Sequence, residues 1–225
     1  MARRILVLAA MAAGLCALAG LGASVAAPTS KPALPGLFDL PRPAPPPALA
    51  FTYRGWKIDA TGSGHAQAAE RTVRLVKAQL DLVEGAGLRP EVLQTLRAVP
   101  VVVSPGLAPE AATFRPPGVI EVHARQLDAR KPTLLRALML AQYGRLDSRA
   151  AADVARYRQQ ILARRAWPRS AEMLQDDRNF FADTATAYLY GAITREPYNR
   201  ANLHKTQPDY YQWLARLFDG GRARR

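Results

Sequence analysis

Apolar and polar residues in the first half of the folded region follow strand and helix periods in turn. Residues 51–58 (FTYRGWKI) alternate aromatic or aliphatic with polar side chains, which predicts a strand. Residues 65–84 carry an apolar residue at every third or fourth position and stop at Gly85, which predicts a helix with one buried face. A short helix and two buried strands are predicted next, at 90–98, 101–103 and 119–123. This half is therefore expected to form a small sheet with a helix against it.

The second half shows only the helical period. Four segments place apolar residues on one face, at 133–145, 148–164, 177–190 and 209–218. Strands come first and helices afterwards, which indicates an α+β domain: a small N-terminal sheet with a helix, followed by a mostly helical C-terminal half.

The segment before the domain has the features of an export signal. Arg3 and Arg4 precede an apolar run over 5–21, and Ser24-Val25-Ala26 fits the small-x-small cleavage rule, so residues 1–26 are predicted to be a signal peptide. This predicts a periplasmic or secreted protein. The alternative is an uncleaved membrane anchor, because residues 5–27 are long enough to span a bilayer.

Residues 27–50 contain eight prolines and are predicted to be an extended linker. The domain is then expected to cover residues 51–225. The only cysteine, Cys16, lies in the export segment, so the mature chain needs no disulfide.

The formal net charge of +13 points to anionic partners such as lipid headgroups or envelope polymers. Most of the basic residues are arginines, and they are spread along the chain rather than gathered in a dense run. No RNA-binding signature or zinc knuckle is present, so specific binding of nucleic acid is not expected.

Two segments carry a resemblance to a known family. Residues 132–143 (PTLLRALMLAQY) and residues 179–183 (NFFAD), with 187–191 and 196–200 (EPYNR) after them, resemble the two active-site helices of small zincin metallopeptidases. That group includes the catalytic domain of the anthrax-lethal-factor type. The resemblance covers residues 101–218 and implies a zincin-like fold. Residues 119–123 resemble the strand that lines the substrate cleft.

The resemblance also implies that the zinc site is lost. The family carries His-Glu-x-x-His on the first helix and a carboxylate ligand on the second, because histidines at i and i+4 grip one zinc ion while the glutamate activates its water. The corresponding positions here are Arg136, Ala137, Leu140 and Asn179. Arginine repels a dication, and leucine and alanine have no donor atom. We therefore expect no metal cofactor and no catalytic residues of the family type.

Metal ligands elsewhere in the chain are not indicated by spacing. His65, His123 and His204 lie in three separate segments, and none has a second histidine at ligand spacing. Asp176 or Asp177 is expected to cap the helix that begins near them, rather than to bind a metal.

The function expected from these features is that of an exported, non-catalytic, zincin-like domain that binds a protein or peptide partner in the cell envelope. A ligand cleft is expected to include Arg136, Asp183, His123 and Tyr143, with Arg136 either paired with Asp183 or holding an acidic group of the ligand. Two alternatives stay open: an active metallopeptidase or other hydrolase with displaced ligands, and a basic envelope protein that binds anionic lipid or polysaccharide.

Overall fold

The computed structural model describes residues 49–63, 66–165, 167–168, 171–193, 199–221 and 224, all of which belong to one unit that begins at Pro45. The expected signal peptide and nearly all of the expected linker lie outside the described residues. Among the described residues, no helix has both the length and the apolar character needed to cross a membrane.

A mixed sheet of five strands forms the first half of the described region. The strands follow the spatial order β1-β2-β3-β5-β4, and their bounds are β1 Ala50–Tyr53, β2 Trp56–Asp59, β3 Val101–Ser104, β4 Ala112–Arg115 and β5 Val119–His123. The three inner strands are parallel, whereas β1 and β4 pair antiparallel to their neighbours and form the two edges. The α+β class predicted from the sequence is confirmed.

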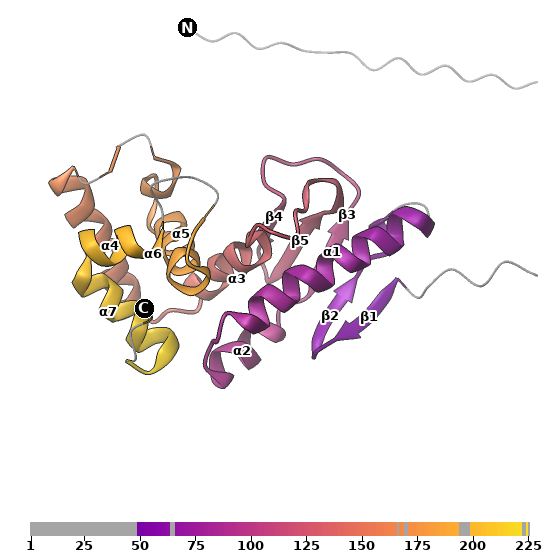
Figure 1. The fold of residues 1–225 in the computed structure, drawn as a ribbon, viewed down its shortest axis with the longest axis horizontal. Helices are drawn as coiled ribbons and strands as arrows, with labels where there is room; N and C mark the ends of the chain where they lie inside the picture. The colour runs from indigo at the N-terminus through magenta and orange to yellow at the C-terminus, as the bar shows by residue number, and fades with distance from the viewer. Residues whose placement is uncertain are drawn as a thin grey trace, which may run out of the picture. The chain divides into compact units, whose positions relative to one another are not determined.

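Seven α-helices accompany the sheet in the described region (Figure 1). Their bounds are α1 Ala66–Gly85, α2 Pro90–Arg97, α3 Thr133–Tyr143, α4 Ser148–Arg164, α5 Asp177–Tyr190, α6 Arg200–Thr206 and α7 Pro208–Asp219. Helix α1 runs along the sheet, while α4, α5, α6 and α7 gather beside it. Helix α3 joins the two halves, because it contacts α1 and β4 in the first half and α5 in the second.

The core is centred on α3 and α5, which are apolar on more than one face. Residues 137–141 of α3 are all buried, and so is every residue from Phe180 to Leu189 of α5. A helix that is buried all round must lie inside a domain. Tyr210, Tyr211 and Phe218 of α7 pack against α5 with no more than 1% of their surface exposed. Each large side chain of this kind contributes roughly 1.5–3 kcal/mol by leaving water. This packing holds α7 against α5.

Three local predictions are wrong. The single strand expected at 51–58 is a hairpin, because Arg54 and Gly55 adopt positive φ angles of 49° and 85° and reverse the chain. Strand β4 lies between the strands predicted at 101–103 and 119–123, where no element was predicted, and α6 was not predicted either. Both are short: β4 is held by pairing with β5, and α6 has a single fully buried residue, Leu203, so neither has a clear period of its own.

Candidate functional site

Helices α3 and α5 bring together three of the residues singled out in the sequence. Asn179 and Asp183 lie one turn apart on the same face of α5, and Arg136 of α3 points at both. The guanidinium Nε of Arg136 donates to Asp183 Oδ1 at 2.5 Å, and Nη2 donates to Asn179 Oδ1 at 3.0 Å. The side chain of Arg136 is 17% exposed and that of Asp183 is 9% exposed. Of the two roles expected for Arg136, the pairing with Asp183 is present.

Glu110 completes this group, which we call the Arg136 cluster: Arg136, Glu110, Asn179 and Asp183. Glu110 lies in the connection between β3 and β4, and its Oε2 accepts a hydrogen bond from Arg136 Nη1 at 2.8 Å. The guanidinium thereby joins α3, α5 and the β3–β4 connection. Sequence reasoning missed Glu110, because 26 residues separate it from Arg136 and no periodic pattern relates them. The signal available was a single acidic residue in an otherwise apolar and proline-rich connection.

The start of α5 fixes the orientation of Asn179. Asp176 is the N-cap of this helix: Oδ1 accepts from the backbone N–H of Asn179 at 2.7 Å, and Oδ2 accepts from its side-chain Nδ2 at 2.8 Å. The second contact requires the amide oxygen of Asn179 to face away from Asp176, toward Arg136. The capping role expected for Asp176 is confirmed.

The Arg136 cluster carries more negative than positive charge. Burial lowers the pKa of Arg136, but the carboxylates of Asp183 and Glu110 more than offset this and raise it above its ordinary value. Burial raises the pKa of the Asp183 carboxyl above its ordinary value, and the ion pair with Arg136 opposes this shift only in part. Glu172 and Glu110 add to the rise. The guanidinium is therefore held charged by several acids that compete for one cation.

Ala137 and Leu140, two of the positions expected at the lost zinc site, are buried on α3. Of the other two residues expected in the cleft, Tyr143 packs its ring 5.9 Å from that of Phe181. His123 is buried at the end of β5, with Nδ1 3.2 Å from the carbonyl oxygen of Gly106. Within the described residues, no hydrogen bond or ion pair connects His123 or Tyr143 to the Arg136 cluster.

The residues at the expected metal position do not fit a zinc ion. The oxygens of Asp183, Glu110 and Asn179 all bond the guanidinium of Arg136, whose positive charge would repel a dication at the same place. Neither Ala137 nor Leu140 offers a donor atom. No group of three or more His, Cys, Asp or Glu side chains in the described part of the chain is placed to hold a metal; His65 lies outside that part.

An edge strand lies next to the Arg136 cluster. Strand β4 begins two residues after Glu110, contacts α3, and is the last strand in the sheet. Arg178 of α5 reaches this strand: its guanidinium lies 5.2 Å from the ring centroid of Phe114 and donates to the carbonyl oxygen of the same residue at 3.5 Å. We expected residues 119–123 to line a cleft, but β5 is an inner strand paired on both sides.

Comparison of the chain with protein-family models, with curated proteins and with solved structures finds no match in any of the three. The geometry by itself defines an α+β domain in which a buried arginine joins two helices and the segment before an edge strand.

Proposed function

We propose that this chain is an exported, non-catalytic, zincin-like domain that binds a protein partner through an extended peptide segment. The observation that carries the proposal is the 3.0 Å contact between Arg136 and Asn179. These residues occupy the first and last of the four positions that the zincin resemblance assigns to the metal site. They lie 43 residues apart in the sequence, and a chance resemblance would not require them to meet.

In this proposal the guanidinium takes the place of the metal ion as the cation of the site. It pairs with Asp183 and so links α3 to α5, and it bonds Glu110 just before the start of β4. A planar group with five N–H donors suits this task, because it bonds several oxygens at once without a hydrolytic water. The domain thus keeps the helix arrangement that a metal would otherwise stabilise and has no general base at Ala137.

The partner is proposed to add a strand to β4. An edge strand presents unpaired backbone N–H and C=O groups, which is the usual basis for binding an extended peptide. Arg136 itself already has three partners within the chain, so we do not assign it the role of anchor for an acidic ligand.

The zincin-like arrangement is tested by installing the family's ligands. In the quadruple variant Arg136→His, Ala137→Glu, Leu140→His, Asn179→Glu, we expect about one equivalent of zinc per chain after dialysis against trace zinc, because three protein ligands in this geometry bind the ion tightly. We expect less than about a tenth of an equivalent in the wild-type chain. Elemental analysis of both folded proteins measures the difference.

The matched control keeps Leu140 and carries the other three substitutions, so that one ligand is missing; it should hold clearly less zinc than the quadruple variant. A folded quadruple variant without zinc would show that α3 and α5 do not have the zincin arrangement. One full equivalent in the wild-type chain would favour the alternative of an active enzyme with displaced ligands.

A further inference from the structure

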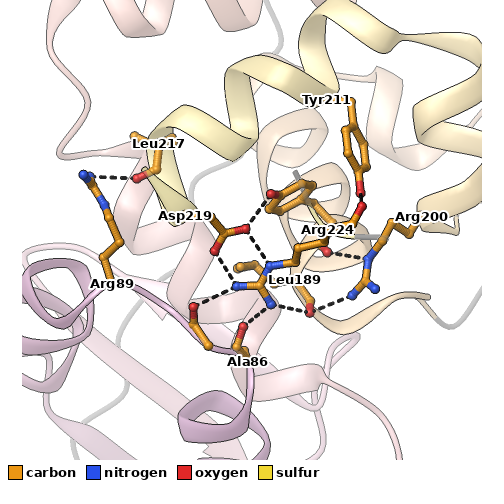
Figure 2. A network of polar contacts seen from close by, with 10 residues as sticks. Ala86, Arg89, Leu189, Arg200, Tyr211, Leu217, Asp219 and Arg224 are labelled. Atoms are coloured by element: carbon orange, nitrogen blue, oxygen red, sulfur yellow. Dashed lines mark hydrogen bonds and ion pairs between the residues drawn. The ribbon is translucent and has the colours of Figure 1, made fainter. Parts of the chain in front are cut away.

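Three helices end at the same place in the fold. Helix α1 ends at Gly85, α5 ends at Tyr190, and α7 ends at Asp219, and the guanidinium of Arg224 lies between them (Figure 2). The last carbonyl groups of a helix have no partner within it and carry the negative end of its dipole. Three such ends together make a site that favours a cation.

Every N–H of the Arg224 guanidinium has an acceptor at this site. Nε and Nη2 form a two-pronged contact with the carboxylate of Asp219, at 2.7 Å and 2.6 Å. Nη2 also donates to the carbonyl of Gly87 at 2.8 Å, while Nη1 donates to the carbonyls of Leu189, at 3.3 Å, and Ala86. The five donors of a guanidinium are thereby all used, which is the condition for specific binding of this group.

Aromatic groups complete the pocket around Arg224. The ring of Tyr188 lies 5.6 Å from the centre of the guanidinium, and its hydroxyl donates to Asp219 Oδ2 at 2.5 Å. Burial raises the pKa of Tyr188, so this hydroxyl keeps its proton at neutral pH. Tyr211 donates a hydrogen bond to the backbone carbonyl of Arg224. The pocket therefore contacts both the side chain and the peptide group of the arginine.

The backbone on both sides of the pocket is shaped for close approach. Gly87 has φ +65°, and a Cβ atom there would lie 3.3 Å from Nη2 of Arg224. Gly220 and Gly221 also have positive φ angles, of 65° and 97°, and they turn the chain back after α7. The arginine that fills the pocket is thus carried on a segment attached through two glycines, and its side chain stays 19% exposed to solvent.

We propose that this pocket, formed by Asp219, Tyr188, Tyr211 and the carbonyls of Ala86, Gly87 and Leu189, is a binding site for a peptide-borne arginine. Arg224 fills it within the chain, and an arginine of another peptide takes its place when Arg224 is displaced. The site is separate from the Arg136 cluster and does not depend on the proposed function. Lysine is a poor substitute, because an ammonium group has three donors and cannot bridge Asp219 and three carbonyls in one plane.

The test empties the pocket in the full chain with Arg224→Ala and then supplies the arginine separately. We expect the substitution to lower the folding equilibrium constant about a hundredfold, because Asp219 loses its ion pair and the carbonyls of Ala86 and Gly87 lose the donors that Arg224 supplies. Addition of about 10 mM N-acetyl-arginine N-methylamide should restore it about elevenfold if the dissociation constant is about 1 mM. Thermal unfolding followed by circular dichroism measures both effects. The matched lysine derivative should give less than half of the rescue.

One further variant and one further measurement complete the test. In Arg224→Ala with Asp219→Asn the rescue should disappear, because the carboxylate that binds the guanidinium is gone. If Arg224→Ala does not fold by itself, the refolding yield with and without the arginine derivative replaces the thermal measurement. The proposal is overturned if the arginine derivative stabilises the wild-type chain as much as Arg224→Ala, or if the lysine derivative is equally effective. Free arginine at the same concentration shows whether the peptide groups on either side of the side chain are needed.

Discussion

A single arginine side chain organises the candidate site. Arg136 is mostly buried and bonds oxygens of three other residues, two of them carboxylates. Hydrogen bonds to charged groups contribute about 1.5–3 kcal/mol each, while a buried charge that loses its partner is penalised by more than the bond is worth. Asp183 would pay the largest penalty of this kind, because its side chain is only 9% exposed and water cannot replace the lost partner.

Replacement of Arg136 by alanine should therefore lower the free energy of unfolding by about 3–5 kcal/mol. Urea unfolding measures the change, and Arg149→Ala on the exposed side of α4 is the control, expected within about 0.5 kcal/mol of wild type. The double variant Arg136→Met, Asp183→Leu removes both charges and should lose less than Arg136→Ala alone. Equal losses in the single and double variants would contradict the view that the unpaired carboxylate is the main cost.

At the scale of elements, the long helices were predictable and the short pieces were not. The bounds predicted for α4 and α5 agree with the structure, because a cap residue stands before each helix and a residue with positive φ, Arg165 or Gly191, comes after it. Strand β4 has four residues next to Pro116 and Pro117 and depends on pairing with β5, which is a contact that a local pattern does not contain. Short elements of this kind are fixed by tertiary structure.

The candidate site divides in the same way. The zincin resemblance led to the prediction of Arg136 and Asn179, and Asp183 lies one turn after Asn179 on the same face of a regular helix. Glu110 was not predictable, because it lies in an irregular connection. The positions of His123 and Tyr143 were predicted wrongly, because His123 contacts the carbonyl of Gly106 and Tyr143 packs against Phe181. The sequence thus allowed the residues on α3 and α5 to be predicted, but not the residue in the β3–β4 connection.

The proposed binding edge on β4 makes a prediction at this scale. A photo-crosslinking residue at Thr113 should give a discrete product with a partner protein in the cell envelope, because β4 is the sheet edge beside the Arg136 cluster. The same residue at Gln159, on the exposed side of α4, is the control and should not give that product. Arg178→Ala should strengthen the product, since Arg178 occupies the carbonyl of Phe114. Identical crosslinks from both positions would contradict binding at β4.

At the scale of the whole molecule, the excess of arginine has a structural use. Several arginines donate to backbone carbonyls of other segments: Arg89 to Leu217, Arg145 to Thr95, and Arg158, which also pairs with Asp177, to Leu174 and Gln175. These contacts satisfy carbonyl groups at the ends of helices or in turns. These arginines therefore support the fold and still contribute to the net charge of +13, because a carbonyl group is neutral.

Because α3 contacts both halves, we expect the domain to unfold in one cooperative transition. Trp56 reports on the sheet half, where it is fully buried and donates to Glu84 at 2.7 Å. In the variant Trp167→Phe, Trp213→Phe, the fluorescence of Trp56 and the far-ultraviolet circular dichroism, which the helices dominate, should change at the same urea concentration. If the two halves unfolded as separate units, the helical signal would be lost at a different urea concentration from the Trp56 signal. Coincidence in this variant, and its loss when Leu135 or Leu138 of α3 is replaced by alanine, would place the coupling in the buried side chains of that helix.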